Sequence, residues 1–136
     1  MLVDSSVWVE FFRTNDGAEV FLLTAALRAH RFVALTPSVL QETLQGASSL
    51  AVFRKWRRAL DDVVLLLVPD PGATHVAAAE LYVRCRGAGV TPRSANDCLI
   101  ACSAIKFDVP ILHRDQDFPR IAAVEPRLRL IERPAG

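Results

Sequence analysis

The chain has 136 residues, of which 51% are hydrophobic, and its formal net charge is +1 at pH 7. This length predicts one domain with a sizeable core, whereas the longest apolar run, 63–68, is too short to cross a bilayer. The start has no signal-peptide pattern, so we expect a cytoplasmic protein with no membrane partner, while the near-neutral charge neither favours nor excludes nucleic acid.

The first residues combine a short strand with the start of a helix. Leu2 and Val3 predict a very short buried strand that ends at Asp4, and Ser5 and Ser6 can cap the helix that follows. A carboxylate at the point where a buried strand opens into a helix lies at the edge of a sheet. Proteins of the α/β class bind ligands at such edges.

Strands and helices are expected to alternate along the rest of the chain. Further strands are predicted at 32–35, 63–68, 109–112 and 127–131. Helices are predicted at 18–29, 37–46, 50–60, 73–86 and 94–105, with a loop over 113–118 that enters a short helical turn, and a tail over 133–136. The alternation predicts an α/β sandwich with a mainly parallel sheet and helices on both faces, in a single domain over 1–136.

The segment 18–29 is apolar on two sides. Phe21 and Leu22 lie on one helical face, and Leu23 and Leu27 lie on the opposite one. A helix of this kind is either deeply buried or covered by a partner.

Three cysteines, Cys85, Cys98 and Cys102, are an odd number and do not indicate a disulfide framework. Cys98 and Cys102 are one helical turn apart, but structural zinc needs four ligands and only three scattered histidines are available. Reduced thiols in the core are the favoured interpretation.

Five acidic residues lie near predicted strand ends or helix starts. Asp4 ends the first strand, Asp115 and Asp117 follow the strand at 109–112, Asp97 lies in the first turn of its helix, and Glu42 lies in the helix after the second strand. Because parallel strands end at one edge, several of these acids can meet there. Clustered carboxylates repel each other, and a divalent cation such as Mg²⁺ relieves the repulsion and suits phosphodiester chemistry.

Most of these acids also have a purely structural explanation. Ser94 and Asp97 fit a capping box, and Glu42 falls outside the apolar stripe of its helix, where most glutamates face solvent. Asp115 can cap the short helix that follows it. Asp117 would then lie in the first turn of that helix, where the positive end of the helix dipole favours an acid. Asp4 has no such explanation, so the residues alone leave both interpretations open.

Four segments, in this order, resemble PIN-domain ribonucleases, specifically the VapC-type toxins of prokaryotic toxin–antitoxin pairs. They are Val-Asp-Ser-Ser-Val-Trp at 3–8, Thr-Pro-Ser-Val-Leu-Gln-Glu at 36–42, Asn-Asp-Cys-Leu-Ile-Ala at 96–101 and Leu-His-Arg-Asp-Gln-Asp-Phe at 112–118. The resemblance covers nearly the whole chain. Each motif is weak alone, and their order and spacing make the set specific.

The resemblance implies a PIN-like three-layer α/β/α sandwich with a five-stranded parallel sheet in the order 3-2-1-4-5. It implies a catalytic site of acids that bind Mg²⁺, with Mn²⁺ as a possible substitute, and polar residues that support them. The acids are Asp4, Glu42, Asp97 and Asp115, with Asp117 as a fifth member, the metal ligands are Asp4, Asp97, Asp115 and Asp117, and the supporting residues are Ser5, Ser6 and Asn96. His113 stands where many relatives have Thr or Ser.

The activity implied by the resemblance is cleavage of RNA by an endoribonuclease toxin. The implied partners are an RNA substrate, a VapB-like antitoxin and a second copy of the chain, with the apolar helix as interface. Candidate RNA contacts are Arg84, Arg86, Arg93 and Arg114, because acids repel phosphate, whereas the basic run 54–58 is interpreted as a solvated helix face. The alternatives are a housekeeping PIN nuclease in RNA processing and a non-catalytic doubly wound binding or signalling domain.

Overall fold

The computed structural model describes residues 1–132, and the predicted tail at 133–136 lies outside the described residues. Within that range the strands form a parallel sheet with the order β3-β2-β1-β4. The strands are β1 (Leu2–Val3), β2 (Ala34–Leu35), β3 (Val64–Leu65) and β4 (Ile111–Leu112). The α/β class and the parallel sheet are therefore as predicted, with the strand that ends at Asp4 in the interior of the sheet.

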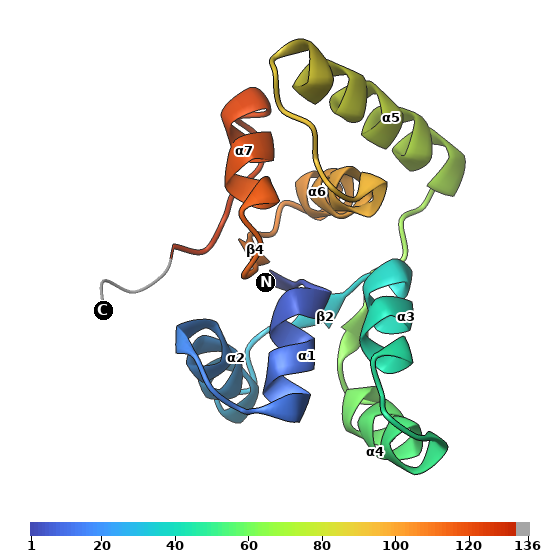
Figure 1. Ribbon diagram of the computed structural model, residues 1–136, viewed down its shortest axis with the longest axis vertical. Helices are drawn as coiled ribbons and strands as arrows, with labels where there is room; N and C mark the ends of the chain where they lie inside the picture. The colour runs from blue at the N-terminus through green and yellow to red at the C-terminus, as the bar shows by residue number, and fades with distance from the viewer. Residues whose placement is uncertain (133–136) are drawn as a thin grey trace.

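Helices cover both sides of these short strands. They are α1 (Ser5–Arg13), α2 (Ala18–Arg28), α3 (Pro37–Gln45), α4 (Leu50–Leu60), α5 (Pro71–Gly87), α6 (Ala95–Phe107) and α7 (Asp117–Val124). In Figure 1, α1 to α4 lie on one side of the strands and α5 to α7 on the other. The strand order accounts for this division. The chain moves outward from β1 to β3 and then returns across the sheet to β4, and crossovers between parallel strands are almost always right-handed, which places the two directions of travel on opposite faces.

Two strand predictions differ from the structure. The segment 127–131 was expected to be a fifth strand, but it contributes only an isolated parallel bridge between Leu130 and Ile111. The bridge is on the outer side of β4, where the fifth strand was expected. The segment 63–68 was expected to be a buried strand, yet Val64 and Leu65 are 42% and 40% exposed. They are exposed because β3 is the last strand at an edge of the sheet.

The core is formed by side chains from the strands and from the inner faces of the helices. Trp8, Ile100 and Phe118 are among its largest fully buried members. Cys85 and Cys98 are also buried in it as free thiols, and burial raises the pKa of Cys98 to about 12. Both positions agree with the interpretation of these cysteines as core residues.

Helix α2 is apolar on both sides, as its sequence indicated, but only one side enters the core. Val20 and Leu23 are buried, whereas Phe21 is 72% exposed. The outer face of α2 therefore presents a large apolar side chain to solvent.

Within residues 1–132, no helix combines the length and the apolar character that crossing a membrane requires.

Candidate metal centre

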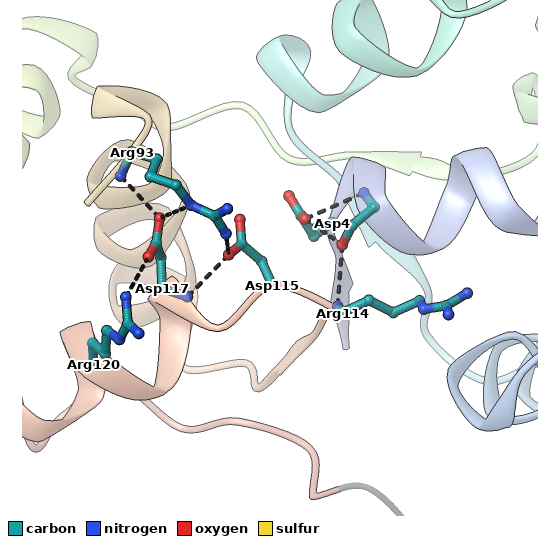
Figure 2. Close-up of polar contacts among 7 residues, drawn as sticks. Asp4, Arg93, Arg114, Asp115, Asp117 and Arg120 are labelled. Atoms are coloured by element: carbon teal, nitrogen blue, oxygen red, sulfur yellow. Dashed lines mark hydrogen bonds and ion pairs between the residues drawn. The ribbon is translucent and has the colours of Figure 1, made fainter.

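Three aspartates converge at the edge of the sheet where the strands end. Asp97 lies in the first turn of α6, Asp115 in the loop after β4, and Asp117 at the start of α7. Each offers one carboxylate oxygen, and these oxygens all lie within 4.8 Å of one another. Asp4 and Glu42 are not members of this mutually close set. Figure 2 shows Asp115 and Asp117 side by side, with Asp4 across from them.

Asp97 experiences the charge of all the other predicted acids. Its side chain is buried, and Oδ2 accepts no hydrogen bond from any described residue. Burial and then the charges of Asp4, Asp115, Asp117 and Glu42 raise the pKa of Asp97 to about 7. The capping-box alternative does not explain this side chain, because Ser94 Oγ caps α6 at the Asn96 amide and Asp97 faces the acids.

Asp4 itself caps α1, which corrects the prediction that Ser5 or Ser6 does so. Its Oδ2 accepts hydrogen bonds from the Ser6 amide at 3.2 Å and from Ser6 Oγ at 2.6 Å. Ser6 Oγ in turn accepts a bond from the Arg114 amide at 3.1 Å, so the loop after β4 is tied to the end of β1 (Figure 2). Burial raises the pKa of Asp4, and the bonds from Ser6 oppose that rise.

Glu42 is held by side chains from two other helices. Its carboxylate accepts a hydrogen bond from Ser5 Oγ at 2.8 Å and another from Asn96 Nδ2. Ser5 precedes Glu42 by 37 residues and Asn96 follows it by 54, so no local sequence pattern predicts either contact. The alternative in which Glu42 simply faces solvent does not account for these two bonds, which form because tertiary packing brings α3 beside α1 and within reach of α6.

Two arginines neutralise part of the acidic group. Arg93 donates from its backbone amide to Asp117 Oδ2 at 2.9 Å, and its Nη2 donates to Asp115 Oδ1 at 3.0 Å. Arg120 lies 3.5 Å from Asp117 Oδ1 (Figure 2). Sequence reasoning missed Arg120, although its spacing of three residues from Asp117 on one helix was a usable signal.

The other arginines proposed as RNA contacts have partners within the chain. Arg84 pairs with Glu125 at 3.3 Å, and the Arg86 guanidinium lies 5.9 Å from the centre of the Tyr82 ring. Arg114 lies 3.6 Å from Glu10 and 3.8 Å from Glu19. The Arg114 side chain therefore connects the loop after β4 with α1 and α2.

The donor set fits a hard divalent cation. Its members are carboxylate oxygens, which Mg²⁺ and Mn²⁺ prefer, and Asp97 Oδ2 is a buried acceptor that no donor in the described part of the chain satisfies. A cation among these oxygens would also relieve the charge repulsion that, after burial, raises the pKa of Asp97.

Comparison with known proteins agrees with the motifs. Residues 1–124 match the family model of the PIN domain. The chain is 37% identical over 125 residues to VapC ribonuclease Mb1587 of Mycobacterium bovis and to Ribonuclease VapC11 of Mycobacterium tuberculosis, with 91% of this chain and 92% of each relative covered. Its fold is similar to a chain in the crystal structure of VapBC2 from Rickettsia felis bound to a DNA fragment from their promoter, with a TM-score of 0.71, 17% identity and 96% of both chains covered. The chain therefore belongs to the PIN-domain family and, within it, to the VapC ribonucleases.

Proposed function

We propose that this protein is a Mg²⁺-dependent endoribonuclease and the toxin of a VapBC-type toxin–antitoxin pair. The observation that carries the proposal is Asp97, a buried aspartate among four other acids, with a pKa of about 7 and an oxygen that no residue within 1–132 satisfies. Structural aspartates are usually satisfied by hydrogen bonds, and a cluster that disfavours its own ionisation is typical of a functional site. The named activity of the relatives at 37% identity supports ribonuclease chemistry.

Asp97, Asp115 and Asp117 are the proposed ligands of the cation, with Asp4 contributing from the end of β1. A bound divalent cation supplies polarisation of the phosphate and stabilisation of the leaving oxygen. Ser6 positions Asp4, while Ser5 and Asn96 position Glu42, whose carboxylate can then orient a water molecule toward the phosphate. These hydrogen bonds hold the two outer acids in place before substrate arrives.

The proposed partners are an RNA substrate, a VapB-like antitoxin and a second copy of the chain. The exposed Phe21 on the outer face of α2 supports an apolar interface there. The crystal structure with a similar fold is of a VapBC2 assembly, which supports an antitoxin partner. Arg93 is the proposed RNA-contacting arginine that already lies at the acids.

The direct test is incubation with total RNA, with and without EDTA, followed by mapping of new 5′ ends. We expect discrete new ends with Mg²⁺ or Mn²⁺ and none with EDTA, because the carboxylates cannot act on phosphate without a cation between them. Discrete ends that persist in EDTA would contradict metal dependence, and their absence under all conditions would contradict the nuclease. Growth arrest on expression distinguishes a toxin from a housekeeping nuclease.

Arg93 is expected to compete with the cation for the same oxygens. Its guanidinium contacts both Asp115 and Asp117, so the Arg93→Gln variant should bind Mn²⁺ more tightly than the unmodified protein. We expect a gain of about fivefold or less, because exposed ion pairs are screened by solvent. Isothermal titration calorimetry with Mn²⁺ measures the change. Arg129→Gln is the matched control, since Arg129 pairs with Asp108. Equal or weaker binding by Arg93→Gln would show that the guanidinium does not compete.

A further inference from the structure

Helix α4 carries a cluster of cations that have no partner in the described part of the chain. Arg54, Lys55, Arg57 and Arg58 are exposed, and none of their side chains makes a hydrogen bond or an ion pair with residues 1–132. Arginines elsewhere in the molecule are often paired. Ion pairs are made by Arg84, Arg93, Arg114, Arg120, Arg127 and Arg129. We name the four cations of α4 the α4 basic face.

Packing of the opposite side of α4 determines the direction of this face. Trp56 and Leu60 are buried, and the Trp56 ring stacks on Phe12 of α1 with centroids 5.1 Å apart. The helix therefore cannot rotate its cations inward. Arg54, Arg57 and Arg58, together with Asp61, line a surface hollow of about 310 Å³. In Figure 1, α4 lies next to α3, the helix that carries Glu42, and away from α6 and α7.

We propose that the α4 basic face binds the phosphate backbone of RNA outside the acidic centre. This inference rests on the proposed function, because it identifies where the substrate of that nuclease is held. The acids at the sheet edge repel phosphate, and a net charge of +1 provides no general attraction. RNA affinity beyond the proposed Arg93 contact therefore requires a local concentration of cations, and α4 provides four within five residues, none of them paired within residues 1–132.

The chemistry of this face fits a nucleic-acid backbone better than a protein partner. Apart from Leu50 at its first residue, α4 exposes no large apolar side chain. Protein interfaces usually have an apolar centre, whereas the α4 basic face consists of long cationic side chains. Contacts of this kind hold phosphates without reading bases, so selection of the RNA sequence must occur elsewhere.

The test compares two double variants that each remove two exposed positive charges. Arg54→Gln/Arg58→Gln alters the α4 basic face, and Arg28→Gln/Arg31→Gln alters exposed arginines at the end of α2. Glutamine favours helices and all four arginines are exposed, so both variants should fold. Binding of a long unstructured RNA is measured by fluorescence anisotropy over a series of KCl concentrations, in EDTA to prevent cleavage.

We expect the α4 variant to bind this RNA less tightly than the unmodified protein. The plot of log K against log[KCl] should also become less steep by about 1.4, because each of the two lost phosphate contacts contributes about 0.7 to the slope. The α2 variant should match the unmodified protein. Equal slopes for both variants would overturn the proposal. Polyglutamate serves as a probe for an acidic protein partner. If the α4 variant binds RNA as well as the unmodified protein does but no longer binds polyglutamate, the proposal is overturned in favour of such a partner.

Cleavage assays separate this inference from the proposed function. With Mg²⁺, the α4 variant should cleave an RNA trinucleotide as fast as the unmodified protein but a long RNA more slowly, because only the long RNA reaches α4. Absence of cleavage by the unmodified protein would contradict the proposed nuclease, while a difference in anisotropy between the variants would still support the RNA-binding face. Equal loss of cleavage on both RNAs would contradict a remote role for α4.

Discussion

Replacement of Asp97 by asparagine is expected to reduce RNA cleavage by more than about 100-fold and leave the protein folded. Even the outer partners of metal ligands contribute about 10- to 100-fold, so loss of the carboxylate of a proposed ligand should cost more. The fold should survive, because Asp97 Oδ2 accepts no hydrogen bond from the described residues and the substitution removes a repulsive charge. Initial cleavage rates in Mg²⁺ and thermal unfolding of both proteins measure the two effects.

Asp108→Asn provides the matched control for this variant. Asp108 ends the same helix, α6, in a left-handed conformation (φ 52°) that asparagine also adopts readily, and its side chain is far more exposed than that of Asp97. We expect Asp108→Asn to cleave RNA at the unmodified rate. Full activity of Asp97→Asn would exclude Asp97 from the reaction. Asp4→Asn is a less direct test, because Asp4 also caps α1.

The metal-free protein is expected to lose stability as the pH rises. The pKa of Asp97 is about 7 in the folded protein, against an ordinary value of 3.8. Between these values the unfolded chain releases the proton and the folded chain keeps it, so rising pH favours unfolding. The free energy of unfolding should fall by 1.36 kcal/mol per unit over this range, which gives a loss of up to about 3 kcal/mol between pH 5 and pH 8. Burial of Asp4 acts in the same direction.

Urea unfolding in EDTA at several pH values measures this dependence, and Asp97→Asn isolates the contribution of one side chain. The difference in stability between the variant and the unmodified protein should grow from acid pH to about pH 7 and then remain constant. Mn²⁺ should remove most of the loss above pH 7 if it binds the ionised carboxylates of the proposed ligands. A difference that does not depend on pH would show that the pKa of Asp97 is not raised.

The positions of Asp4, Asp115 and Asp117 could be predicted from local sequence. Each follows or closes a short apolar strand, and parallel strands end at one edge, so a one-dimensional pattern was sufficient to place them there. Glu42 shows where this reasoning fails. Its helix has no periodic feature that directs it to the edge, and its place depends on contacts with Ser5 and Asn96 in other helices. Only the family motif identified it from sequence.

The sequence by itself determined the α/β class and the helices through periodicity and capping residues. It also determined the family through its motifs, and the order of most strands followed from that resemblance. The tertiary structure decided which charges are paired. Arg93 and Arg120 meet the acidic group, Arg114 meets Glu10 and Glu19, and the basic run of α4 has no partner among residues 1–132. Ion pairs and burial depend on distances between segments that are remote in sequence. The raised pKa of Asp97 therefore becomes visible only when the whole chain is folded around it.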